Sequence, residues 1–298
     1  MMKDRTDMAQ PREDEAKIIG VVSDEFTNPY TVTLLNELTR QLNQRGCVTL
    51  LLNVSSRDGL QAALNGAARL QPTALVFLSS LSSDELRVTA DILPQVPAIY
   101  IGTAAPDTSA DSIRVDGHTA GKQVARLLSS QGYTRFGYLQ AQDSAPLPQQ
   151  AGYGEGLAAA HHAVTKVLTA GGFDREHAWR ATLAYLKQTW ASERIDALFC
   201  DNDELAFGAL QAVRDFGERV HVGVVGSGDT SEAHSATWHL TSLSQRSDLL
   251  VGEALSRLLD NQSRSEGDWR HGELKVRHSH LSRETFSEPS QCGCASRH

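Results

Sequence analysis

Residues 18–22 read IIGVV and residues 23–30 read SDEFTNPY, and this first unit of strand, loop and helix start decides the fold class. The apolar run has the length of a strand, and Asn28 followed by Pro29 is typical of a helix N-terminus. Similar units recur along residues 17–259. A chain that alternates strands with capped amphipathic helices builds parallel sheets with helices on both faces. Ligands then bind at the carboxyl ends of the strands, so the loops indicate function.

The apolar pattern predicts the remaining strands and helices. Asp201 and Glu204 have the spacing of a reciprocal cap, which is expected at the start of the helix at 202–216. We expect strands at 48–52, 74–78, 98–101, 112–115, 135–139, 164–168, 197–200, 221–225, 240–244 and 273–277. We expect helices at 29–45, 59–70, 83–93, 119–130, 149–160, 175–190, 202–216 and 248–259.

Composition limits the classes of function. The 298 residues carry a net charge of −8, which repels phosphate backbones and argues against a nucleic-acid-binding surface. No apolar run is long enough for a transmembrane helix, and residues 1–16 lack the apolar stretch of a secretory signal. A cytoplasmic location is therefore expected, although a mature exported protein would have the same composition.

Cysteine spacing and the absence of catalytic motifs predict neither a cofactor nor a metal site. Cys47 and Cys200 adjoin apolar strands and are expected to be buried, whereas Cys292 and Cys294 lie in a polar tail without a second pair at zinc spacing. No serine elbow, nucleophile–base pair or phosphate loop is visible, so the chain is not expected to be an enzyme.

Several segments share the order of a known family. The most specific, residues 196–210, reads DALFCDNDELAFGAL, and residues 222–226 continue it with VGVVG. These segments, with residues 240–245 and 273–277, resemble the effector-binding core of LacI/GalR-type (lactose-repressor) bacterial transcription regulators. The resemblance implies an α/β fold of two similar lobes, each a parallel sheet flanked by helices, of the periplasmic-binding-protein-like type I, with a ligand cleft between them.

The resemblance also implies how the chain is divided. The expected N-terminal lobe comprises residues 17–115 and 247–272, and the expected C-terminal lobe comprises 116–246 and 273–286. Residues 1–16 and 287–298 are expected to be disordered. Residues 1–16 hold no counterpart of the family's helix-turn-helix, so this chain, as given, is expected to contact DNA only through a module that it lacks. A carbohydrate-like effector and a homodimer are the expected partners.

Position by position, the resemblance assigns residues to the ligand cleft. Phe173 would stack on a ligand ring, since an aromatic face suits the C–H surface of a sugar. Asn202 would bind vicinal hydroxyls, because an amide both donates and accepts. Gln245 would contact both the ligand and a lobe crossing. The full set is Tyr30, Thr31, Asp116, Gln149, Phe173, Asn202, Asp229 and Gln245.

This sequence departs from the family pattern at three cleft positions. Gln149 stands where the family has arginine, Gly228 where it has aspartate, and Gly102 where it often has aspartate. The loss of one arginine and one aspartate leaves the pocket charge unchanged. This pattern favours a changed ligand over an ordinary free hexose, with Asp229 as a substitute carboxylate beside Gly228.

Simpler interpretations stand beside these assignments. Helix capping alone explains Asn28, Asp116 and residues 201–203, and core packing explains Phe173. Two functions from other classes also remain open. A transport-type solute-binding protein would be exported, monomeric and tight-binding, and an enzyme would need catalytic residues that the sequence does not offer. The sequence favours the effector-binding core of a regulator.

Overall fold

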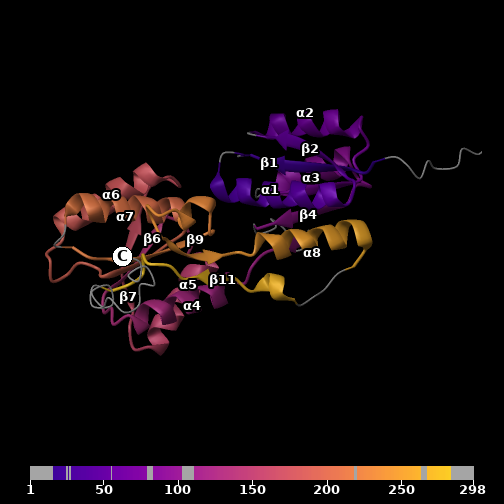
Figure 1. Ribbon diagram of the computed structural model, residues 1–298. Coiled ribbons are helices and arrows are strands. Elements are labelled where there is room, and N and C mark those ends of the chain that lie inside the picture. Colours follow the sequence, from indigo (N-terminus) through magenta and orange to yellow (C-terminus); the bar gives the residue numbers. More distant parts are fainter. Residues whose placement is uncertain are drawn as a thin grey trace, which may run out of the picture.

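The computed structural model describes residues 16–282, apart from 25, 27, 55, 79–82, 103–110, 218–219 and 263–266. These residues form two lobes, each built on one sheet (Figure 1). The segments expected to be disordered lie outside the described residues except for Ala16, and so do Cys292 and Cys294.

The sheet of the first lobe has the strand order β2-β1-β3-β4-β5, with every neighbouring pair parallel. Its strands are β1 (Ile18–Ser23), β2 (Val48–Asn53), β3 (Ala74–Phe77), β4 (Ala98–Ile101) and β5 (Ser112–Ile113). The helices of this lobe are α1 (Pro29–Gln44), α2 (Arg57–Ala68), α3 (Ser83–Ile92) and α8 (Ser247–Asp260).

Alternate residues of β1 are buried on opposite faces of this sheet. Ile19 and Val21 pack with α1 and α8, and Val22 packs with α2 and α3. Helix α8 follows the second sheet in sequence but packs against α1 and β4. The Gln41 side chain fixes this return, because its Nε2 donates to the carbonyl oxygen of Asp248 at 2.9 Å.

The sheet of the second lobe has the order β11-β10-β9-β8-β6-β7. Its strands are β6 (Phe136–Gln140), β7 (Val164–Thr169), β8 (Ala197–Cys200), β9 (Gly223–Ser227), β10 (Thr241–Ser244) and β11 (Glu273–Lys275). Its helices are α4 (Gly117–Ser130), α5 (Pro148–Ala159), α6 (Arg175–Gln188), α7 (Asp203–Phe216) and the 3-10 turn η1 (Ser231–His234). A second 3-10 turn, η2 (Asp268–Arg270), contacts α8. The expected two-lobed α/β fold is confirmed, except that β11 runs antiparallel to β10.

Helices cover both faces of the second sheet. Tyr138 and Phe199 pack with α4 and α5, whereas Leu139, Leu198 and Cys200 pack with α6 and α7. Both described cysteines, Cys47 and Cys200, are buried as expected.

Glycine allows α4 and α5 to approach closely. A Cβ at Gly152 would lie 1.9 Å from the carbonyl oxygen of His118, and one at Gly121 would lie 2.0 Å from that of Gln149. The contact therefore positions the N-terminus of α5, and with it Gln149.

Several element ends differ from the prediction by one or two residues, and two of the differences have a clear physical reason. The N-cap of α7 is Asn202, whose side chain accepts from the Leu205 amide, and not the predicted pair of Asp201 and Glu204. Strand β9 begins at Gly223 and extends to Ser227, two residues beyond the prediction, because Ser227 pairs with Leu243 of β10.

Candidate functional site

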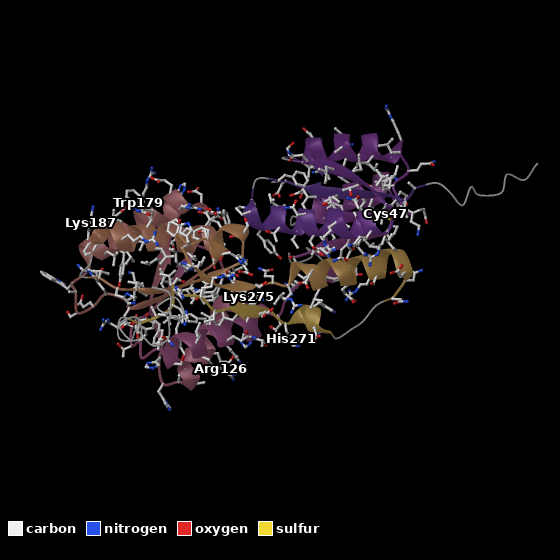
Figure 2. All side chains as sticks on the ribbon, viewed as in Figure 1. Cys47, Arg126, Trp179, Lys187, His271 and Lys275 are labelled. Carbon is white, nitrogen blue, oxygen red and sulfur yellow. The ribbon has the colours of Figure 1, made fainter. Side chains whose placement is uncertain are left out.

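Within the described residues, three segments cross between the lobes: 114–116, 245–246 and 271–272. The amide of Asp116 donates to the carbonyl oxygen of Arg270 at 2.8 Å, and Nη1 of Arg246 lies 3.5 Å from Oε2 of Glu273. These contacts join the first and second crossings to the third, on which Figure 2 labels His271.

Gly272 lies where the three crossings are close together. A Cβ on Gly272 would be 3.2 Å from Leu243 and 3.3 Å from both Val115 and the carbonyl oxygen of Ser244. The crossings therefore pack directly on one another at this point.

Tyr30 connects the first lobe to the second crossing. Its Oη donates to Oε1 of Gln245 at 2.7 Å, and burial raises the pKa of Tyr30, so the hydroxyl stays protonated. A Cβ on Gly102 would lie 3.0 Å from Oη of Tyr30, and Gly102 has φ +79°. The absence of a side chain at residue 102 therefore lets the tyrosine ring lie at the end of β4.

Asn28 fixes the position of Tyr30 by capping α1. Its Oδ1 accepts from the amides of Tyr30 at 2.9 Å and Thr31 at 3.3 Å. Thr31 is buried, with 9% of its surface exposed. Capping thus accounts for Asn28, and it directs the Tyr30 hydroxyl toward Gln245.

Gln149 belongs to a polar cluster at the carboxyl ends of β6 and β8. Its Nε2 donates to Oη of Tyr138 at 3.3 Å and to the carbonyl oxygen of Asp201 at 3.2 Å. Tyr138 donates to Oδ1 of Asp201, and the Ala141 amide donates to Oδ2 at 2.8 Å. We call Tyr138, Ala141, Gln149 and Asp201 the Asp201 cluster.

Burial and hydrogen bonding oppose each other in the Asp201 cluster. Burial raises the pKa of Asp201, while hydrogen bonds from Tyr138, Ala141 and Gln149 act to lower it, and the net pKa is above its ordinary value. The pKa of Tyr138 is also raised, by burial and by the neighbouring carboxylate. Tyr138 therefore remains a donor toward Asp201.

Asp116 lies next to this cluster. Its Oδ1 accepts from the Thr119 amide at 3.2 Å and its Oδ2 accepts from the Thr119 hydroxyl at 2.6 Å, so it caps α4. The hydroxyl bond is the main reason that the pKa of Asp116 is lowered. A Cβ on Gly117 would lie 3.3 Å from the Gln149 amide nitrogen, so the starts of α4 and α5 are adjacent.

Phe173 and Asn202 form a separate pair on the loops after β7 and β8. The Phe173 residue is 57% exposed, and its carbonyl oxygen accepts from Nδ2 of Asn202 at 3.4 Å. Oδ1 of Asn202 accepts from the Leu205 amide at 2.8 Å. The aromatic ring is therefore available to a ligand, whereas the Asn202 oxygen is already bonded within α7.

Asp229 lies apart from the other predicted residues. It has φ +49°, and its Oδ1 accepts from Nη2 of Arg277 at 2.7 Å and lies 3.4 Å from Nε2 of His234. The segment around it packs on the α7 side of the sheet, with Ala233 in the core there. The carboxylate is thus paired within the second lobe, on the face opposite Gln149.

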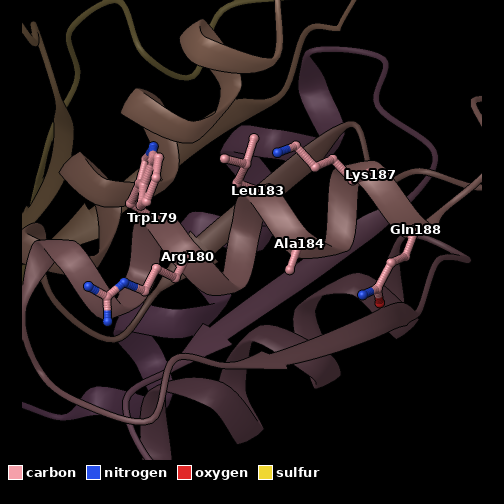
Figure 3. Close-up of a pocket in the computed structure, with 6 residues that line it drawn as sticks. All are labelled: Trp179, Arg180, Leu183, Ala184, Lys187 and Gln188. Atoms are coloured by element: carbon pink, nitrogen blue, oxygen red, sulfur yellow. The ribbon is translucent and has the colours of Figure 1, made fainter.

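An open hollow of about 320 Å³ lies elsewhere, on the outer side of α6. Figure 3 shows one row of side chains formed by Trp179, Leu183 and Lys187. A second row is formed by Arg180, Ala184 and Gln188. None of the residues predicted to bind a ligand lines this hollow, which lies toward the end of α6 that is remote from the carboxyl ends of the strands.

The sequence analysis did not identify Asp201 and Tyr138, two members of the Asp201 cluster, as candidate ligand-binding residues. Asp201 was interpreted only as a cap, and Tyr138 only as part of a strand. The alternation of side chains along a strand could have identified Asp201. Residues 197, 199 and 201 point to the same face of the sheet, so the Asp201 side chain follows Phe199 on that face.

The described residues offer neither a metal-binding group nor a membrane-spanning helix. Within them, no three His, Cys, Asp or Glu side chains are grouped so that they could hold a metal ion. No helix in the same part of the chain is long and apolar enough to cross a bilayer.

The chain is similar to known transcription regulators. The chain is 26% identical over 259 residues to the HTH-type transcriptional repressor PurR from Escherichia coli O1:K1, covering 83% of this chain and 74% of the repressor. The structure is similar to the lac repressor dimer bound to operator and the anti-inducer ONPF, with a TM-score of 0.76, 17% identity and coverage of 91% of this chain and 96% of that one. It is also similar to the transcription regulator GntR from Chromobacterium violaceum, with a TM-score of 0.71, 22% identity and coverage of 89% and 99%.

A sequence model of a protein family matches most of the chain and agrees with the two-lobed fold. Residues 16–251 match the model of periplasmic binding proteins and the sugar-binding domain of the LacI family. The match spans most of both lobes and includes the Asp201 cluster. The chain belongs to the family of periplasmic binding proteins and LacI-type sugar-binding domains.

Proposed function

We propose that this chain is the effector-binding core of a LacI-type transcription regulator and that a sugar or sugar derivative binds between its lobes. The observation that carries the proposal is the position of the predicted residues. Tyr30 and Gln245 meet at a lobe crossing, Gln149 lies in the first turn of α5, which follows β6, and Phe173 lies on the loop after β7. The similarity to PurR favours a regulator over a transport-type binding protein.

Ligand-controlled closure is the proposed mechanism. The lobe boundaries proposed for it are the ones expected from the sequence, with hinges at the three crossings. A ligand that contacts both lobes favours the closed state by its differential affinity for that state. The Tyr30–Gln245 hydrogen bond supports this mechanism, because it joins the start of α1 to the second crossing. In a full-length protein, closure would change operator affinity by linkage.

The decisive experiment is a thermal-shift screen with sugars and sugar derivatives. A ligand at a hundredfold excess over its dissociation constant adds about 2.7 kcal/mol to the free energy of unfolding. We expect at least one carbohydrate-like compound to raise the Tm and to decrease the radius of gyration in small-angle scattering. A full screen without a raised Tm would contradict the proposal.

Phe173→Ala is expected to weaken the binding of any hit about tenfold, because an aromatic contact is removed from the ligand. Trp190→Ala is the matched control: Trp190 is also exposed, at 78%, but it follows the far end of α6. Calorimetric titration checks both variants. Equal losses in the two variants would show that Phe173 has no special place in the site.

We also propose that the protein is a cytoplasmic homodimer. Strand β2 is the edge of the first sheet, and its Val48 and Leu51 are each 50% exposed. An edge strand with exposed apolar side chains is a surface that pairs readily with another chain. These features support β2 as part of the dimer surface.

Leu51→Lys is expected to convert the dimer to a monomer, since the substitution places a charge in an apolar contact. Light scattering coupled to gel filtration should then give the mass of a single chain, 32.4 kDa, in place of twice that value. Val276→Lys, at a residue 57% exposed outside β2, should leave the mass unchanged. A dimer that survives Leu51→Lys excludes this surface.

A further inference from the structure

Asp201 has no cationic partner in the described structure. The Tyr138 hydroxyl and the Ala141 amide donate to its carboxylate, the Gln149 side chain donates to its main-chain carbonyl oxygen, and all three donors are neutral. No Lys, Arg or His of the described residues forms an ion pair with it. A carboxylate that is largely removed from water and lacks a counter-charge is costly to ionise, in agreement with the raised pKa of Asp201.

Ser227 is an independent sign of a ligand at the same place. Only 4% of the residue is exposed, and its Oγ has no hydrogen-bond partner among the described residues. A Cβ on the preceding Gly226 would point at Asp203 and Ala206 of α7, so the Ser227 side chain points to the opposite face. Extending the parallel register of β8 and β9 by two residues places Ser227 beside Asp201.

The arginines after the strands of the second sheet are already paired. Arg175, after β7, lies 3.3 Å from Oε2 of Glu204 and 2.7 Å from Oε2 of Glu232. Arg246, after β10, lies 3.2 Å from Asp248 and 3.5 Å from Glu273. An anionic ligand would therefore compete with existing ion pairs, whereas a cation would meet the unpaired Asp201.

We propose that the effector carries a protonated primary amine that binds the Asp201 carboxylate, next to hydroxyl groups that bind Gln149 and Ser227. This inference rests on the proposed function and names its ligand class: an amino sugar or a similarly sized hydroxylated amine. The ammonium group supplies the charge that the neutral donors lack. A small shift of the surrounding residues exposes the buried Ser227 hydroxyl, which then forms a hydrogen bond with a ligand hydroxyl next to the amine.

Matched compounds test the inference. For each of the gluco, galacto and manno scaffolds, the 2-amino sugar, the parent hexose and the uronic acid are titrated into the full chain by calorimetry. On one scaffold, the amine should bind at least about tenfold more tightly than the hexose, as a charge-assisted hydrogen bond implies, and the uronic acid should bind most weakly. The affinity for the amine should fall as the pH is lowered through the pKa of Asp201.

Two variants locate the effect. Asp201→Asn should reduce the affinity for the amine to that for the parent hexose, whereas Asp143→Asn, at an exposed carboxylate after β6, should change neither. Ser227→Ala should leave the Tm unchanged, because Oγ has no partner to lose, and should weaken binding about threefold to tenfold. Ser227→Ala keeps the test valid if Asp201→Asn fails to fold.

Each outcome separates the inference from the proposed function. If a parent hexose or a uronic acid binds as tightly as its amine, the amine inference is wrong and the effector-binding function stands. If the preference for the amine persists in Asp201→Asn, or survives unchanged in Ser227→Ala, the assignment to this cluster is wrong. If no compound on any scaffold binds, both the inference and the carbohydrate-like effector are overturned.

Discussion

Gly152→Ala is expected to destabilise the second lobe by about 3 kcal/mol, the upper end of the usual cost of overpacking a core. The reason is steric, since the added methyl carbon would lie 1.9 Å from the carbonyl oxygen of His118 and 2.7 Å from the carbonyl carbon. Backbone atoms cannot rotate away as a side chain can, so α5 must move off α4. Chemical denaturation followed by circular dichroism measures the loss.

The same helix provides the control. A Cβ on Gly154 would meet no atom within 4 Å, so Gly154→Ala should stabilise the protein by about 0.5–1 kcal/mol through helix propensity alone. Opposite signs at two positions of α5 would identify close packing, and not glycine flexibility, as the cause. If Gly152→Ala is neutral, the close contact between α4 and α5 is not a feature of the folded protein.

Asp203→Ala should cost about 3 kcal/mol, because it removes the acceptor of several buried donors. Oδ2 of Asp203 accepts from the amide of Thr230 at 2.7 Å and its hydroxyl at 2.9 Å, and Oδ1 accepts from the Ser242 hydroxyl at 2.5 Å. These bonds hold the loop after β9 against α7 and β10. Asp143→Ala, at an exposed carboxylate, should be neutral in the same denaturation experiment.

The pH dependence of stability gives a second measure of Asp203. Burial is the largest cause of its raised pKa, so the folded state holds this proton more tightly than the unfolded state. The contribution of Asp203 to stability is therefore greatest below the unfolded pKa and decreases as the pH rises through the folded pKa. Asp203→Asn keeps the shape of the side chain and should abolish this part of the pH profile. If Asp203→Asn leaves the pH dependence of stability unchanged, that dependence comes from other titratable groups.

The periodic parts of the fold were predictable from local sequence. The strand at 98–101 was predicted to the residue, because its continuous apolar run is what a strand buried on both faces requires. Strand β9 was misplaced, since its last pair depends on Leu243 in a strand formed later in the chain. The antiparallel direction of β11 depends on the path by which residues 271–272 re-enter the second lobe. No local sequence pattern predicts that path.

Only those parts of the candidate site that depend on residues close together in sequence were predictable. The cap formed by Asn28 and the exposure of Phe173 follow from their own neighbourhoods. The contacts that define the rest connect distant residues: Tyr138 reaches Asp201 across 63 positions, and Arg277 reaches Asp229 across 48. Partners so far apart are brought together only by tertiary structure. The sequence alone therefore predicted neither the Asp201 cluster nor the pairing of Asp229 with Arg277.

The packing of three crossings around Gly272 restricts how the lobes can move. In the proposed closure, three connections packed together would permit bending about a common line but resist sliding and twisting, so the motion would reduce to one angle between the lobes. In the proposed mechanism, each effector would then act through a change in this one angle, whatever its shape. Under this mechanism, the side chains of the proposed site would discriminate between ligands, and the angle that each bound ligand stabilises would set the strength of the response.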